Sequence, residues 1–187
     1  MNLAKRMQRL GTETAFECLC RAKELECKMD VIHLEIGEPD FSTPEHIVEA
    51  AKRALDEGWT HYGPSAGLPE LRAAVAQYAG RLRGVRFFPE QVVITPGAKP
   101  VMSFAIMALV EPGDEVIYPN PGFPIYESMI EFTGGRPVPI RLREEKGFRL
   151  DSEELTSLVN PRTKLIIINS PANPTGGVLT QEDLRLI

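Results

Sequence analysis

The residues whose types and spacing most clearly suit ligand binding lie at 169–177. They read N-S-P-A-N-P-T-G-G and follow a short apolar run at 164–168. That run predicts a buried strand, and Thr180 and Asp183 predict the capped start of a following helix. Loops at the carboxyl ends of strands are where open α/β sheets bind ligands. The Asn173 amide both donates and accepts hydrogen bonds, so this loop is a candidate binding site. Asn-Pro and Gly-Gly are also ordinary turn formers, and that interpretation stays open.

Two more loops follow predicted strands, and parallel strands would bring all three loops to one edge of a sheet. The first contains Gly97, Ala98 and Lys99 and leads into a predicted helix. Small residues there let backbone N–H groups approach an anion at the positive end of the helix, as in a phosphate site. A glycine at such a junction is also common for geometric reasons alone. In the second loop, Phe123 could stack on a flat cofactor or fill the core.

Several other kinds of site are disfavoured by the sequence. It contains no Walker loop, no G-x-G-x-x-G after a strand, no G-x-S-x-G and no His-Glu-x-x-His. The histidines share no metal-ligand spacing: His33, His46 and His61. The cysteines fall on one predicted helix, where their thiols cannot converge on an ion: Cys18, Cys20 and Cys27. We therefore expect no metal site, and we expect reduced thiols in a cytoplasmic protein.

Charge and hydropathy limit the partners. The 187 residues carry a net charge of −5 with no basic cluster, so neither nucleic acid nor an anionic membrane is an expected partner. No apolar run approaches the roughly 18 residues of a membrane span. The basic N-terminus lacks the apolar segment of a secretory signal. These features are typical of a globular protein that acts on small molecules.

From residue 92 onward, apolar strand-like runs alternate with helical patterns. Strands are predicted at 92–95, 115–118, 138–141 and 164–168, and helices at 99–110, 125–132 and 152–159. This alternation predicts a three-layer αβα fold with a mostly parallel sheet.

Before residue 92 we predict a first amphipathic helix, a strand at 31–36 and two helices. Thr43 and Pro44 predict the start of the first of these two helices, and Gly58 predicts its end. The apolar residues of the two helices are expected to face inward: Ile47, Ala50, Ala51, Ala54, Leu55, Leu71, Val75, Tyr78 and Leu82.

Six motifs in order resemble the N-terminal half of the fold-type I pyridoxal-phosphate aminotransferases, in the aspartate aminotransferase class. They are G-E-P-D-F at 37–41, Y-G-P-S-A-G at 62–67, T-x-G-A-K at 95–99, P-G-D-E-V at 112–116, P-x-F-x-x-Y at 121–126 and N-P-T-G at 173–176. The resemblance covers nearly the whole chain from residue 31. It implies pyridoxal 5′-phosphate as cofactor, with an amino acid and a 2-keto acid as substrates.

The resemblance assigns roles to the same loops. Gly97, Ala98 and Lys99 match the segment that holds the cofactor phosphate through backbone N–H groups. Phe123 matches the aromatic ring that stacks on the pyridine face. Asn173 matches the residue that hydrogen-bonds the cofactor ring oxygen and the substrate carboxylate.

Two further matches involve the substrate and a second subunit. Gly37 matches a backbone contact to the substrate carboxylate. Tyr62 matches a tyrosine that reaches the phosphate of the neighbouring subunit, which implies a homodimer. By the same analogy, the 120–121 and 173–174 peptide bonds are expected to be cis.

The resemblance also implies what this chain does not contain. The family's Schiff-base lysine lies beyond the N-P-T-G motif, as do an aspartate on the pyridine nitrogen, a tyrosine on the ring oxygen and substrate-binding arginines. Lys99 belongs to the phosphate segment and is no substitute for the lysine. We therefore expect no catalytic residue in this chain and no transaminase activity from it alone.

The domain arrangement follows from the same comparison. Residues 1–44 would form an N-terminal arm and part of a small domain, and residues 45–187 an incomplete large domain that binds the cofactor. The chain stops inside a predicted helix, which is typical of a fragment. An unpaired sheet edge would favour self-association.

Other functions remain open. A carbon–sulfur lyase or a synthase of the same fold type would share these motifs, and a truncated scaffold would need no catalysis. A ligand sensor with a helix-turn-helix module is disfavoured, because the residues before the predicted strand at 31–36 carry no such module.

Overall fold

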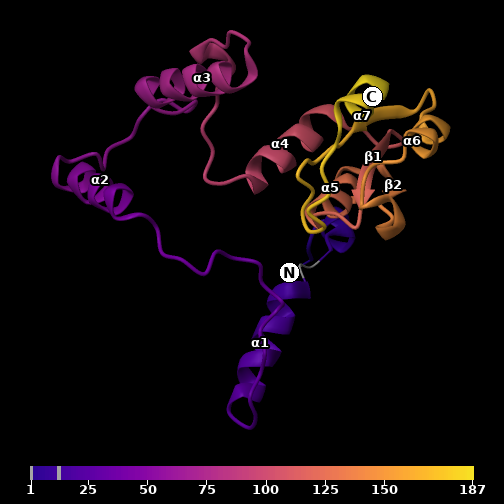
Figure 1. Cartoon of the computed structure of the whole chain (residues 1–187), viewed down its shortest axis with the longest axis horizontal. Helices are drawn as coiled ribbons and strands as arrows, with labels where there is room; N and C mark the ends of the chain where they lie inside the picture. The colour runs from indigo at the N-terminus through magenta and orange to yellow at the C-terminus, as the bar shows by residue number, and fades with distance from the viewer. Residues whose placement is uncertain (1, 12–13) are drawn as a thin grey trace. The chain divides into compact units, whose positions relative to one another are not determined.

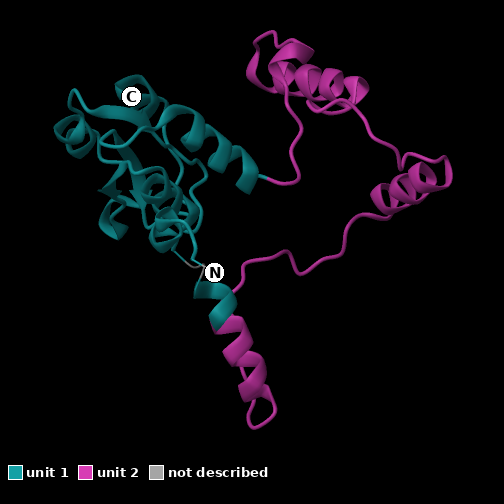
Figure 2. Ribbon diagram, turned by 180° about the vertical axis from the view of Figure 1, so that it is seen from behind, with its two compact units in different colours: residues 1–17, 98–187 teal, residues 18–97 magenta. Residues whose placement is uncertain are grey.

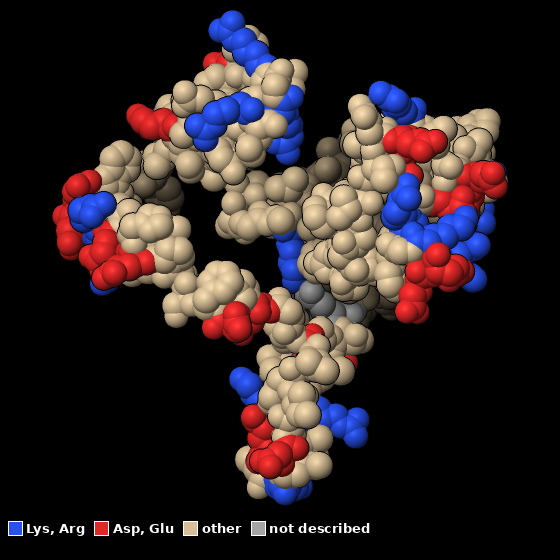
Figure 3. All heavy atoms as spheres, viewed as in Figure 1, with Lys and Arg blue, Asp and Glu red and all other residues tan. Residues whose placement is uncertain are grey.

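The computed structural model describes residues 2–11 and 14–187, in two compact units (Figure 1). One unit comprises residues 1–17 and 98–187, and the other comprises residues 18–97 (Figure 2). We call them the sheet unit and the helical unit, and each is described by itself. On the face shown in Figure 3, acidic and basic side chains are interspersed over the sheet unit.

The sheet unit contains three parallel strands in the order β2-β1-β3. They are β1 (Glu115–Asn120), β2 (Arg136–Arg141) and β3 (Thr163–Ile166). Each connection between consecutive strands contains a helix, α5 (Ile125–Thr133) or α6 (Ser152–Leu158). The two prolines of β2, Pro137 and Pro139, suit its place at the sheet edge, because proline cannot donate a ladder hydrogen bond. The predicted αβα arrangement with a parallel sheet is confirmed.

The sheet separates two apolar cores, because alternate residues of β1 point to opposite faces. Val116 packs in a cluster with α5 and with α4 (Lys99–Leu109), whereas Ile117 packs in a cluster that includes Leu155 of α6. Both β1 side chains are fully buried, and so is Ile130 of α5. These two cores make β1 the centre of the unit, and the loop that follows β1 carries Phe123.

The remaining elements of the sheet unit are short. The 3₁₀ turn η1 (Lys5–Arg9) is near α5, and the Gly11 N–H donates to the Ser128 hydroxyl over 3.0 Å. The 3₁₀ turn η3 (Glu144–Lys146) precedes α6. The last helix, α7 (Gln181–Leu186), begins with the predicted capping box of Thr180 and Asp183. The Arg149 guanidinium also pairs with Asp183, over 2.8 Å.

The helical unit contains α2 (Glu45–Asp56), α3 (Pro69–Arg83) and the 3₁₀ turn η2 (Pro89–Gln91), and α1 (Thr14–Glu26) spans the boundary between the units. All three cysteines are exposed, and Cys27 follows the last residue of α1. Pro44 is the N-cap of α2, one residue beyond the predicted cap at Thr43. Among the described residues, no helix has the length and apolar composition that crossing a bilayer requires.

Two predicted strands, at 31–36 and 92–95, are wrong: both segments lack strand structure. A strand needs a neighbour to satisfy its backbone groups. Backbone groups of the second segment are satisfied in other ways, since the Arg72 side chain donates to the Val92 carbonyl over 2.8 Å and the Ile94 N–H donates to the Ala66 carbonyl over 2.9 Å.

The predicted inward faces of α2 and α3 are also wrong for this chain. Most of the large apolar residues are exposed, including Leu55 at 65% and Leu82 at 61%, whereas Ala76 of α3 is buried. The apolar spacing was a correct signal for helices. Burial of such a stripe additionally needs a second element packed against it, and the described part of the helical unit has no sheet to provide one.

Candidate cofactor site

The carboxyl end of β1 brings a cation and an aromatic ring together. Lys99 is the first residue of α4, and its Nζ atom lies 5.5 Å from the centroid of the Phe123 ring. The same Nζ atom lies 5.6 Å from the centroid of the Phe16 ring, from the start of α1. Both distances are within the range of cation–π attraction. The sheet unit therefore brings two of the predicted cofactor residues into contact.

A buried tyrosine supports the Phe123 ring. The rings of Phe123 and Tyr126 meet edge to face, with centroids 6.1 Å apart and an angle of 82° between planes. Burial raises the pKa of the Tyr126 hydroxyl, and a hydrogen bond with the Asn169 side chain partly opposes that rise. Asn169 begins the loop that ends at Gly177. Tyr126, in α5, therefore contacts Phe123 of the loop after β1 and Asn169 of the loop after β3. Sequence analysis missed this role of Tyr126 and Asn169.

The Asn173 loop is closed by its own backbone. The Ala172 N–H donates to the Gly177 carbonyl over 2.8 Å, and the Gly176 N–H donates to the Ala172 carbonyl over 2.7 Å. The predicted cis bonds at 120–121 and 173–174 are confirmed, and a third occurs at Ser170–Pro171. Asn173 itself is exposed. Its amide is therefore accessible to a ligand at this end of the sheet.

One hydroxyl in this loop lacks a partner. The Thr175 Oγ1 atom is buried and makes no hydrogen bond to any described residue. A buried, unsatisfied polar group costs about 1–3 kcal/mol, so such atoms in native proteins usually have a water or ligand partner. Apart from its place in N-P-T-G, no sequence pattern singles out Thr175.

The start of α4 suits an anion. Gly97 has a φ of +91°, and open space surrounds its Cα, with nothing within 4 Å of a Cβ built there. Ala98 is the N-cap of the eleven-residue helix, and no side-chain cap hydrogen bond occurs there among the described residues. Backbone N–H groups at the positive end of a helix attract phosphates, and the Lys99 ammonium adds a charge. The chemistry of these donors fits the phosphate of a cofactor.

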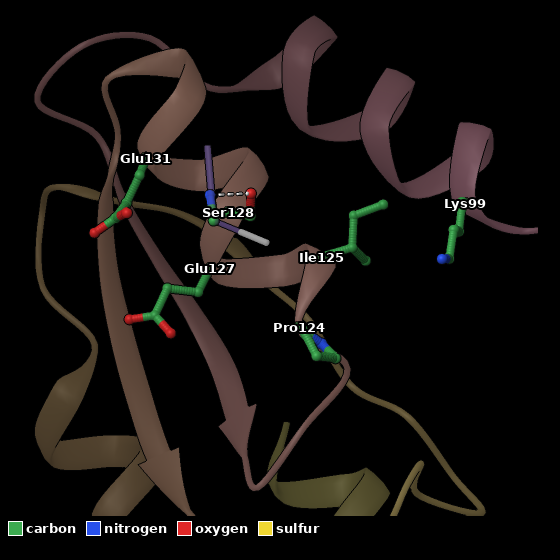
Figure 4. Close-up of a pocket in the computed structure, with 7 residues that line it drawn as sticks. Lys99, Pro124, Ile125, Glu127, Ser128 and Glu131 are labelled. Atoms are coloured by element: carbon green, nitrogen blue, oxygen red, sulfur yellow. Dashed lines mark hydrogen bonds between the residues drawn. The ribbon is translucent and has the colours of Figure 1, made fainter. Parts of the chain in front are cut away.

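A surface cavity of about 300 Å³ borders Lys99 and α5 (Figure 4). Pro124 and Ile125 line it near Lys99, and Glu127 and Glu131 project from α5 (Figure 4). The opposite charges of Lys99 and these glutamates make its lining polar at both ends. Sequence analysis did not predict this cavity, because it depends on how the segment ending at Gly11 packs on α5.

Three predicted site residues belong to the helical unit: Gly37, Tyr62 and Gly97. Gly37 is exposed, and Tyr62 is fully exposed beside a hollow that Trp59 and His61 also line. The roles of Gly37 and Tyr62 in the site stay predictions. Gly97 ends the helical unit, next in the chain to Ala98 of the sheet unit.

A sequence profile of the family described as aminotransferase class I and II matches residues 29–187. The chain belongs to this family. The match covers every motif used to predict the site, from Gly37 to Asn173. Enzymes of this family depend on pyridoxal 5′-phosphate, and the donors at the start of α4, the Phe123 ring and the exposed Asn173 amide fit that group.

The chain is similar to several named aminotransferases along nearly its whole length. The chain is 46% identical over 99% of its length to a probable aspartate/prephenate aminotransferase of Aquifex aeolicus, and 47% identical over 99% to an aspartate aminotransferase of Pyrococcus horikoshii. It covers 47% and 46% of those proteins. An aspartate aminotransferase of Thermus thermophilus, solved with maleate, matches all of the chain with a TM-score of 0.94 at 40% identity, over 49% of its own length.

The chain thus spans about half the length of the relatives it matches, and it corresponds to their N-terminal half. This agrees with the expectation that the chain carries a partial site of the family.

Proposed function

We propose that this chain supplies the phosphate-binding and ring-binding half of the active site in a pyridoxal-phosphate-dependent aminotransferase. The complete protein would move an amino group between an amino acid and a 2-keto acid, with aspartate as the donor suggested by the names of its relatives. The observation that carries this proposal is the placement of Lys99, at the start of α4, within 5.5 Å of the Phe123 ring centroid.

When bound, the cofactor supplies an aldehyde that holds the amino group and a ring that withdraws electrons from the substrate Cα. In this chain, the backbone N–H groups of Gly97, Ala98 and Lys99 bind the phosphate. The Phe123 ring packs on one face of the pyridine and fixes its plane. The Tyr126 ring, held by Asn169, keeps Phe123 in position.

The substrate is oriented by Asn173 and Gly37 in this proposal. The Asn173 amide donates to the ring oxygen of the cofactor and to the substrate carboxylate, and the Gly37 N–H donates to the same carboxylate. Such charge-assisted hydrogen bonds are stronger than neutral ones and hold the reacting carbon in one orientation. Proton transfer at that carbon needs a lysine outside this chain, so the chain alone is proposed to be inactive.

A second copy of the protein completes the site. Tyr62 is fully exposed, and in a homodimer its hydroxyl would reach the phosphate bound by the other subunit. In the complete protein, residues 1–44 would form an arm and part of a small domain, and residues 45–187 part of the large domain. A cytoplasmic location is part of the same proposal.

The Asn173→Ala variant of the complete protein tests the proposal. Hydrogen bonds to charged groups contribute about 1.5–3 kcal/mol, so kcat/KM for aspartate should fall by about 10- to 150-fold. Val178→Ala is the matched control, because Val178 is an exposed side chain of the same region. Equal kcat/KM in the Asn173→Ala variant and the parent protein would refute the role of Asn173.

A further inference from the structure

His33 bridges two carboxylates in the helical unit. Its Nδ1 atom lies 2.6 Å from Glu35 Oε1, and its Nε2 atom lies 2.9 Å from Glu26 Oε1. Glu26 is the last residue of α1, and both His33 and Glu35 belong to the segment 31–36. The ring therefore joins that segment to the end of α1. We call this arrangement the His33 bridge.

The His33 bridge requires a charged ring. A carboxylate can only accept a hydrogen bond, and a neutral imidazole has only one N–H to donate. Both ring nitrogens face carboxylate oxygens at hydrogen-bond distance. The two contacts can be made together only by the imidazolium, so deprotonation must break at least one of them.

The bridge acts on a segment with few other attachments. Residues 31–36 lack strand structure, and within the described residues 18–97 the contact of His33 Nε2 with Glu26 is the side-chain hydrogen bond that joins this segment to α1, whereas the contact with Glu35 lies inside the segment. The segment leads directly to Gly37, which has no atom within 4 Å of a Cβ built on it. The position of Gly37 therefore depends on how the segment before it is anchored.

We propose that His33 is a proton-dependent positioning residue, whose imidazolium anchors the segment carrying Gly37 to α1 and whose deprotonation weakens binding of the substrate carboxylate. This inference rests on the proposed function for the role of Gly37. The bridge itself is independent of that function. His33 touches neither substrate nor cofactor, so it acts through Gly37.

The carboxylates beside the His33 ring determine the pH range over which the His33 bridge forms. Hydrogen bonds to Glu35 and then to Glu26 raise the pKa of His33 above its ordinary value of 6.5, and His33 lowers the pKa of Glu35 below 4.5. Because the folded pKa of His33 is raised, the ring carries its full charge below pH 6.5, and the bridge is lost as the pH rises through the raised value. At low pH it is lost as Glu35 becomes protonated.

An NMR titration of the histidine rings in the 187-residue chain tests the bridge without any need for activity. The His33→Gln variant assigns the His33 resonance. We expect the His33 pKa to lie above 6.5 and to fall toward 6.5 in the Glu35→Gln and Glu26→Gln variants. Glu24→Gln is the matched control, since Glu24 is an exposed residue of α1 outside the bridge. An ordinary pKa that neither variant changes would overturn the proposal.

The pH dependence of KM in the complete enzyme tests the positioning role. KM for the amino acid should rise as His33 deprotonates, with kcat little changed, and His33→Gln should remove this step from the profile. A His33 that titrates high while KM shows no His33-dependent step would refute positioning and leave the proposed function standing. A complete protein without transaminase activity would refute the proposed function, while the titration would still decide the bridge.

Discussion

In the proposed site, Phe123 and Lys99 would contact two different parts of one ligand. The Phe123 ring is held from one side by the edge-to-face contact with Tyr126, and the Lys99 ammonium lies near the ring. An aromatic face recognises a flat ring, and an ammonium at a helix N-terminus recognises a phosphate. Under the proposed function, these contacts would therefore hold the Phe123 ring and the Lys99 ammonium close together before any ligand binds.

Replacement of Phe123 tests the stacking role in the complete protein. Aromatic stacking contributes about 0.5–1.5 kcal/mol beyond burial, so Phe123→Leu should weaken cofactor affinity by about two- to twelvefold. Phe123→Trp keeps an aromatic face and should retain affinity. Titration of the apoprotein with pyridoxal 5′-phosphate, followed by absorbance, measures both. Equal losses in the two variants would mean that Phe123 serves the core and not the cofactor.

The sequence carries a local signal for these candidate residues but none for the residues that support them. Gly97, Phe123 and Asn173 lie in loops after apolar runs, which is a local signal. The bond between Tyr126 and Asn169 joins residues far apart in the chain, and the unpaired hydroxyl of Thr175 depends on how its loop folds. Neither feature leaves a local pattern, so only the structure reveals them.

At the scale of elements, one carboxylate fixes the starts of all three strands. Glu115 begins β1 and is 3% exposed. It accepts hydrogen bonds from Asn160 over 2.7 Å and Arg162 over 2.9 Å, just before β3, and from Arg136 of β2 over 3.2 Å. The register pairs Glu115 with the first residues of both neighbours. The strand order β2-β1-β3 is thus tied together at the edge opposite the candidate site.

Glu115→Gln should destabilise the fold in a pH-dependent way. Asn160 and the two arginines lower the pKa of Glu115 below its ordinary 4.5. A lowered folded pKa gives stability that is present above the unfolded pKa and is lost as the pH falls through the folded value. Urea unfolding should therefore show a lower midpoint for the variant at pH 7 and a shrinking difference below pH 4.5. A constant difference across this range would contradict the account.

Element types were predictable where the pattern was long and local. The predicted alternation of parallel strands and helices from residue 115 onward is confirmed, because each strand pairs with a neighbour in the same unit. The strands predicted at 31–36 and 92–95 failed for lack of such a neighbour in the described chain. An apolar run therefore predicts the tendency to form a strand, and pairing decides whether it does.

At the scale of the whole molecule, the chain exposes apolar surface on both units. In the helical unit, Leu55 of α2 and Tyr78 of α3 are more than half exposed, and in the sheet unit Phe104 of α4 is 59% exposed. The strand β3 also forms an edge of the described sheet. Exposed apolar surface and open strand edges favour association with other chains.

The isolated chain should therefore self-associate. Size-exclusion chromatography with light scattering is expected to show a mass above the 20.8 kDa of one chain at micromolar concentration. Phe104→Ser, which makes an exposed apolar side chain polar, should shift the distribution toward smaller species. A homogeneous monomer for the parent chain would contradict this prediction.

The central claim is that this chain holds the cofactor-binding half of an aminotransferase and needs residues outside itself for catalysis. The most direct test is the rate of amino transfer from L-aspartate to 2-oxoglutarate, measured with equal pyridoxal 5′-phosphate for the 187-residue chain and for the product of the complete coding sequence. We predict turnover by the complete product and, for the chain alone, a rate no higher than that of the free cofactor. Turnover by the chain alone, or an inactive complete product, would contradict the claim.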